Sequence, residues 1–108
     1  MTISHSQKEK EVVFHIVGKL DTITAPTLET YLHEHLKFDT GPVVFDLVAL
    51  EYIASAGLRL LLLSAKQAKA SGQVLQLRRV NTVVLQVLTI AGFTSLFQIH
   101  SQHDIETT

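Results

Sequence analysis

Ser55 is the residue whose type and surroundings first suggest chemistry. It stands between Ala54 and Ala56, just ahead of the leucine-rich segment 57–63. A serine hydroxyl becomes a nucleophile when a histidine and an acid activate it together, and the neighbouring sequence shows no general base, so we do not expect a hydrolase. Serine is also a preferred N-cap, because its oxygen accepts a hydrogen bond from the first turn of a helix. Spacing alone favours this capping role.

Other residue types with catalytic or ligand-binding chemistry form no usable pattern. Of the six histidines, His33 and His35 are two residues apart and point to different faces of a helix. His100 and His103 share a face only if the C-terminal tail is helical. The chain has no cysteine, and its five glycines are not spaced as GxGxxG or GxxxxGK[ST]. We therefore expect no enzymatic activity, no metal site and no cofactor.

The composition predicts a single folded domain. The 108 residues suit one globular unit, and 46% hydrophobic against 18% charged residues supplies enough apolar material for a core. A formal net charge of -1, with no run of like charge, argues against DNA or RNA as a partner. The N-terminus lacks the regions of a signal peptide, and the longest apolar run, residues 60–63, is far shorter than the ~20 residues of a membrane-spanning helix. We expect a soluble, cytoplasmic protein that does not bind membranes.

The order of the predicted elements is that of an α/β fold. Strands are predicted at residues 3–7, 12–17, 43–47, 74–77 and 96–99. Helices are predicted to begin at Thr24, Ser55 and Asn81 and to end near Leu36, Ser71 and Ala91. The alternation implies a mixed, mostly parallel sheet with an antiparallel hairpin at the N-terminus and three main helices. Residues 101–108 are polar, and we expect them to fray.

The helix that begins at Ser55 has two sets of leucines. Leu58, Leu61, Leu62 and Ala65 recur at helical spacing and form a stripe that can pack on the sheet. Leu60 and Leu63 project away from that stripe. Either neighbouring helices cover these two leucines, or they belong to an exposed apolar patch of the kind that marks a protein interface.

The segment around Ser55 resembles a known family. Residues 53–62, with the sequence Ile-Ala-Ser-Ala-Gly-Leu-Arg-Leu-Leu-Leu, and the preceding strand 43–47 resemble the central motif of STAS domains in bacterial anti-sigma factor antagonists. Residues 18–29 are similar to the family's strand, acidic loop and first helix, and residues 87–93 to its third helix. The resemblance spans about residues 12–99 and implies that residues 1–108 form a single STAS domain.

The resemblance also implies a mechanism called partner switching. The unphosphorylated antagonist binds an anti-sigma factor that is also a serine kinase of the histidine-kinase-like ATPase fold, which frees the sigma factor. The kinase then phosphorylates the antagonist on the serine that corresponds to Ser55, and the antagonist is released. A PPM-type serine phosphatase resets the cycle.

The same resemblance assigns the surface that the kinase and partner recognise. Asp21 matches the family's loop acid near the phosphorylation site, although the sequence without the family pattern favours an ordinary turn or capping residue. The surface predicted for partner and kinase recognition consists of Asp21, Thr22, Ala54, Ala56, Gly57, Arg59, Leu60 and Leu63.

The sequence departs from the family pattern in three places. Ala54 replaces an acid that often precedes the serine, Ala56 replaces a second hydroxyl, and residues 104–106 are almost all that could form the usual C-terminal helix. Two other functions stay open. One is a STAS module that regulates another signalling protein, for example in secretion, motility or biofilm control. The other is a scaffold component in which Ser55 serves only as a cap.

Overall fold

The computed structural model describes residues 1–39 and 41–101. The elements in chain order are β1 (Thr2–Lys8), β2 (Glu11–Leu20), α1 (Ala25–His35), β3 (Val43–Asp46), β4 (Leu50–Ile53), α2 (Ser55–Ala70), β5 (Gln76–Val80), α3 (Thr82–Ala91), a 3-10 turn (Thr94–Leu96) and β6 (Gln98–Ser101). None of the helices in these residues is both long enough and apolar enough to cross a membrane.

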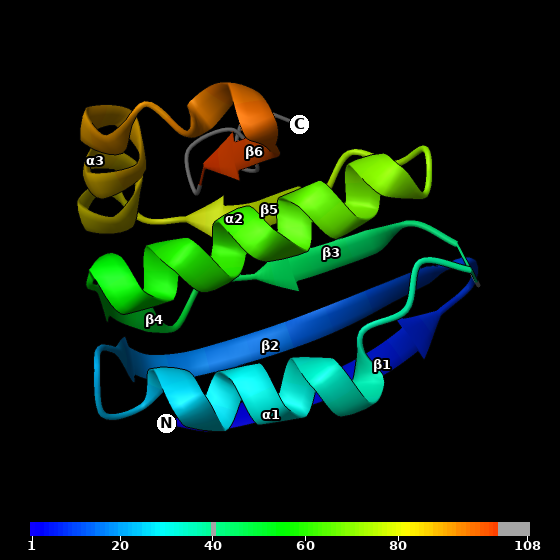
Figure 1. The fold of residues 1–108 in the computed structure, drawn as a ribbon, viewed down its shortest axis with the longest axis horizontal. Coiled ribbons are helices and arrows are strands. Elements are labelled where there is room, and N and C mark those ends of the chain that lie inside the picture. Colours follow the sequence, from blue (N-terminus) through cyan, green and yellow to red (C-terminus); the bar gives the residue numbers. More distant parts are fainter. Residues whose placement is uncertain (40, 102–108) are drawn as a thin grey trace.

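The strands form one mixed sheet in the order β1-β2-β3-β5-β6, with β4 paired to β2 beyond the end of β3 (Figure 1). The β1–β2 hairpin is antiparallel, and every other pair is parallel. One edge of β2 is therefore shared by two short strands. Val12–His15 pair with β3, and Gly18–Leu20 pair with β4.

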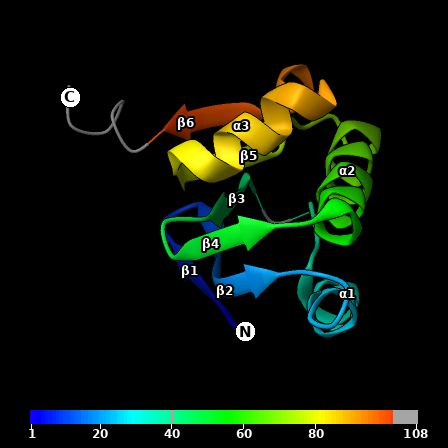
Figure 2. The same cartoon turned by 90° about the vertical axis from the view of Figure 1, so that its left-hand side faces the viewer.

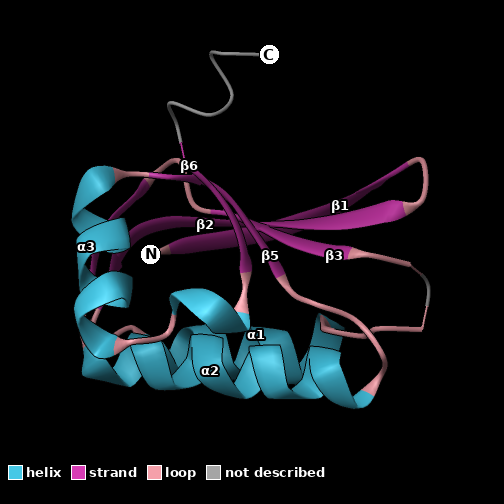
Figure 3. Cartoon of the chain, turned by 90° about the horizontal axis from the view of Figure 1, so that it is seen from above, coloured by secondary structure: helices cyan, strands magenta, loops and turns pink. Residues whose placement is uncertain are grey.

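Helices α1 and α2 lie side by side on one face of the sheet, and the opposite face carries no helix in the described residues (Figures 2 and 3). Helix α3 lies at one end of the sheet beside β4. It is held there by Asn81, which accepts a hydrogen bond from the Val84 amide at 2.8 Å and donates one to the Leu50 carbonyl at 2.7 Å. Gly92 ends the helix in the left-handed conformation, with φ of 77°.

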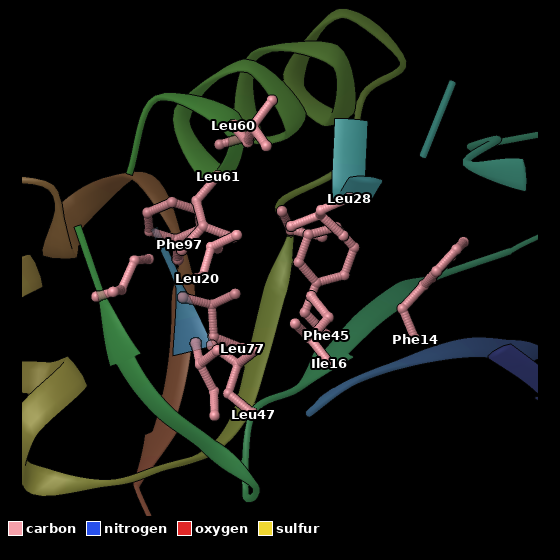
Figure 4. Packing of buried hydrophobic residues seen from close by; sticks show 14 of the residues in the cluster. Phe14, Ile16, Leu20, Leu28, Phe45, Leu47, Leu60, Leu61, Leu77 and Phe97 are labelled. Atoms are coloured by element: carbon pink, nitrogen blue, oxygen red, sulfur yellow. The ribbon is translucent and has the colours of Figure 1, made fainter. Parts of the chain in front are cut away.

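The core lies between the sheet and these helices. Alternate residues of β2 point into it, and Phe14 and Ile16 are fully buried there. Figure 4 shows Leu61 of α2 pointing toward the sheet, where Phe45 of β3 also lies. Burial of each such side chain stabilises the fold by about 1.5–3 kcal/mol.

The open face of the sheet carries a charged cluster centred on the buried Asp46 at the end of β3. The Arg79 guanidinium donates to both Asp46 carboxylate oxygens, one of them at 3.1 Å, and this hydrogen bonding raises the pKa of Arg79. The Val48 amide donates to Asp46 at 3.2 Å, and the His15 ring lies 3.5 Å from the same carboxylate. Beside this cluster, Arg78 forms a two-pronged ion pair with Glu11 at 3.1 and 3.2 Å. The cluster ties β2, β3, β5 and the β3–β4 loop together.

The predicted architecture is confirmed, with three helices, a mostly parallel sheet and an N-terminal hairpin. Several details of the prediction are wrong. Strand β4 was not predicted, and β2 continues to Leu20 instead of ending at residue 17. Strand β5 covers Gln76–Val80 instead of residues 74–77, and residues 94–96 form a 3-10 turn ahead of a later β6. Fraying was expected for residues 101–108 and a shortened helix for residues 104–106. Ser101 is the last residue of β6, and residues 102–108 lie outside the described residues.

Candidate functional site

Ser55 lies where the parallel strands β2 and β4 end together. Leu20, the last residue of β2, pairs with Ile53, the last residue of β4, and both are buried. The Ala54 amide donates to the Leu20 carbonyl at 2.8 Å, which fixes the chain immediately before Ser55. The start of α2 is therefore attached to the start of the β2–α1 loop, although the two are more than thirty residues apart in sequence.

The Ser55 side chain is exposed and does not occupy the capping position of α2. The N-cap is Ala54, with extended φ of -102° and ψ of 177°, and it offers no side-chain hydrogen bond to the helix. Ser55 is the first helical residue. The capping role that spacing favoured is wrong, because β4 brings an extended backbone up to Ala54 and the helix begins one residue later.

Gly57 explains how α2 can start so close to the sheet. A Cβ atom at this position would lie 2.4 Å from Leu20 Cγ and 2.9 Å from Ile53 Cγ1. Contacts this short force neighbouring atoms to move. A residue without a side chain is therefore needed here, which fixes the distance between the first turn of α2 and the ends of β2 and β4.

Asp21 organises the loop beside Ser55. Its Oδ1 accepts hydrogen bonds from the Ile23 amide at 2.9 Å and the Thr24 amide at 3.0 Å. The Thr24 hydroxyl in turn donates to the Lys19 carbonyl at 2.7 Å. The hydrogen bond from the Thr24 backbone, opposed by partial desolvation and supported by that from Ile23, holds the pKa of Asp21 below its ordinary value. The turn-capping interpretation of Asp21 is confirmed, and the tip that it supports exposes Thr22 and Ile23.

This arrangement decides the class of the fold. The structure brings together Ser55 at the start of α2 and the loop of Asp21, which belong to two of the segments by which the sequence resembles the STAS family. The family model for the STAS domain matches residues 2–105. The chain belongs to the STAS domain family.

Individual relatives agree with this assignment. BtrV from Bordetella bronchiseptica, whose name describes it as a candidate anti-sigma factor antagonist, is 36% identical over 87 residues, which cover 81% of this chain and 75% of that protein. An anti-sigma factor antagonist from Mycobacterium paratuberculosis has a similar structure, with a TM-score of 0.82 at 20% identity over 92% of this chain and 84% of that one. The Bacillus cell fate determinant SpoIIAA in its phosphorylated form gives a TM-score of 0.68 at 13% identity, covering 98% and 97% of the two chains. At these identities the structural similarities show the fold.

The two leucines of α2 that were left undecided have different environments in this STAS domain. Leu60 is only 4% exposed, because α1 lies alongside α2 and covers it, whereas Leu63 is 42% exposed. Together with Leu32 of α1 and Leu36, which follows the end of α1, they line a shallow groove between the two helices. Of the two alternatives left open for these leucines, coverage by a neighbouring helix applies to Leu60 and exposure applies to Leu63.

The outward side of α2 is positively charged. It carries Arg59, Lys66 and Lys69 and no acidic residue. Arg59, like Ser55, is exposed, and Ala54 and Ala56 are half-buried beside it. Of the residues predicted for recognition, Gly57 and Leu60 are buried, and the others are exposed or half-buried.

Proposed function

We propose that this STAS domain is an anti-sigma factor antagonist whose binding state is set by phosphorylation of Ser55. The observation that carries the proposal is an exposed serine hydroxyl at the first position of α2, where Ala54 holds the capping position. Family membership and the similarity to BtrV support the antagonist role. The loop of Asp21, joined to the same helix start, supplies a second recognition element for the kinase.

In the proposed cycle this chain is the substrate and its partners are the catalysts. An anti-sigma factor of the histidine-kinase-like ATPase fold transfers the γ-phosphoryl group of ATP to Ser55 Oγ. The new O–P bond forms as the bond to ADP breaks, and the hydroxyl proton passes to a base of the kinase. A PPM-type phosphatase then directs water to the phosphorus, which returns the serine and releases inorganic phosphate.

Phosphorylation weakens binding because of where the charge is placed. A phosphate adds about 1.5–2 negative charges at pH 7. At Ser55 these charges lie at the edge of the outward face of α2, which a bound partner must cover and desolvate. Desolvating this charge costs about 1–3 kcal/mol or more, so we expect a loss of affinity of at least roughly fivefold.

The proposal is tested by mixing the protein with its cognate kinase and ATP and measuring the intact mass. We expect one added phosphate, absent in Ser55→Ala and retained in Ser71→Ala, which removes a serine at the other end of the same helix. Modification at another residue, or none, would contradict the proposal.

The binding consequence is measured by calorimetry with the same kinase. Ser55→Asp should bind at least about fivefold more weakly than Ser55→Asn, in which the side chain has nearly the same shape as aspartate without the charge. Equal affinities would indicate a scaffold in which Ser55 has no switching role. A pull-down that recovers a different signalling protein and no anti-sigma factor would favour the regulatory-module alternative.

A further inference from the structure

The outward face of α2 places a cation one turn after the serine. Ser55 and Arg59 are four residues apart and both exposed, and Lys66 follows on the same side of the helix. Residues at this spacing are neighbours on a helix surface, with Cβ atoms about 5–6 Å apart. An acidic group followed by a basic group four residues later is also the more favourable of the two orders.

The direction of helical side chains brings Arg59 toward Ser55. Each Cα–Cβ bond in an α-helix tilts toward the N-terminus, so a long side chain lies over the turn that precedes it. For Arg59 the preceding turn is the one that begins with Ser55. A guanidinium can donate two parallel hydrogen bonds to a phosphate, which an ammonium group cannot do in the same fixed geometry.

Arg59 is free to take this role. Within residues 1–39 and 41–101, the arginines that form ion pairs are Arg78, with Glu11, and Arg79, with Asp46. Helix α2 contains no acid that could compete for Arg59. The nearby carboxylate of Asp21 accepts its hydrogen bonds from its own loop.

We infer that Arg59 binds the phosphate of phosphorylated Ser55 and holds it against its own helix. The inference rests on the proposed function, since it describes the modified state of the same site. It gives phosphorylation two effects on the outward face of α2. The phosphate adds negative charge, and it also withdraws the Arg59 guanidinium from any partner that the unmodified face binds.

The test uses protein carrying phosphoserine at position 55, introduced during translation so that no kinase is needed. The pKa of the phosphate monoanion, ordinarily about 6, is followed by phosphorus NMR at low salt. Removal of the guanidinium in Arg59→Gln should raise this pKa by roughly 0.2 to 0.4, the equivalent of a helical ion pair. In Arg59→Lys the phosphate pKa should lie between those of the parent and Arg59→Gln proteins. In 1 M salt the pKa difference between parent and variants should disappear.

Lys66→Gln is the matched control, because it removes a charge from the same face eleven residues from Ser55, or roughly 16 Å along the helix axis. It should leave the phosphate pKa unchanged. Equal pKa values in the parent and Arg59→Gln proteins, or equal effects of the two glutamine variants, would overturn the inference.

The result is separable from that of the kinase experiment. A pKa difference without phosphorylation by the kinase would refute the proposed function and leave the Arg59 contact standing. Phosphorylation of Ser55 without a pKa difference would refute the contact and leave the proposed function standing.

Discussion

Ser55 is the first residue of α2, and Ala54 before it occupies the capping position. The alanines, glycine and leucines around Ser55 indicated a helix start, and the structure begins α2 at that residue. Whether a serine is the N-cap or the first helical residue depends on where the preceding strand ends. Strand β4 ends at Ile53 and leaves Ala54 as the cap. With β4 unpredicted, the sequence favoured a capping bond that the fold does not make.

Asp21 was open to two interpretations, and its hydrogen bonds make it a loop cap whatever else it does. Because the folded state lowers the pKa of Asp21 from its ordinary 3.8, the unfolded chain binds this proton at a higher pH than the folded protein does. The contribution of Asp21 to stability is therefore present above pH 4 and is lost as the pH falls toward the folded-state pKa.

We expect Asp21→Asn to lose this part of the pH dependence. In urea unfolding followed from pH 6 down to pH 2.5, the variant should differ most from the parent protein at the upper end and converge with it in acid. Thr22→Ala changes the same loop without removing a carboxylate and should keep the parent's acid dependence. A difference between Asp21→Asn and the parent that stays constant with pH would contradict the assigned hydrogen bonding.

At the scale of elements, segments with a clear apolar pattern were predictable and a segment without one was not. The helices have apolar residues at helical spacing, and the buried strand β3 is a nearly continuous apolar run. Strand β4 has four residues, two of them exposed, and its pairing requires β2 to continue past Gly18, where φ is 110° and the register shifts. Glycine normally marks the end of a strand, so the extension of β2 and the existence of β4 were missed together.

Arg79 marks a second irregularity, at the register shift between β5 and β6. Its φ is 56°, a conformation that costs a side-chain-bearing residue about 1–2 kcal/mol. The sequence Leu-Arg-Arg-Val did not indicate the positive φ of Arg79, because a strand pattern gives no means to tell which of two adjacent arginines has an irregular backbone. The structure distinguishes them by their partners, since Arg79 binds the buried Asp46 and Arg78 binds Glu11.

Glycine and alanine substitutions should show this strain directly. Arg79→Gly and Arg79→Ala both lose the ion pair with Asp46, but glycine accepts the positive φ, so we expect Arg79→Gly to be the more stable by about 1 kcal/mol. At Arg78 the order should reverse, because glycine in an ordinary strand position costs about 0.5–1 kcal/mol relative to alanine. Urea denaturation of the four variants measures both differences, and the same order at both positions would refute the assigned strain.

The whole molecule is a sheet with protected central strands and two outer ones. Strand β3 has β2 and β5 as neighbours, whereas within the described part of the chain β1 pairs with β2 alone and β6 with β5 alone. The charged cluster around Asp46 links the central strands on the open face of the sheet. Helices α1 and α2 cover the other face. The alternation of elements predicted this arrangement, but the order of the strands could come only from their pairing in the structure.

Amide hydrogen exchange should follow that arrangement. We expect the amides of Val43–Asp46 to exchange only through global unfolding and those of Gln98–Ser101 to exchange faster, through local opening at the edge of the sheet. Added denaturant should then accelerate exchange in β3 more steeply than in β6. Equal rates and equal denaturant dependence in both strands would contradict this order.

The placement of Ser55 outside the cap has a consequence for how long the protein survives in a cell. Proteases degrade chains through their unfolded population, and that population changes several-fold when stability changes by 1–2 kcal/mol. A serine that caps a helix contributes about that much, so modifying it would couple the signal to turnover. Because Ala54 holds the cap, the Ser55 hydroxyl can change chemically while the helix keeps its start. If Ser55 is phosphorylated as proposed, the modification leaves the cap of α2 in place, and the amount of the protein then need not change with its binding state.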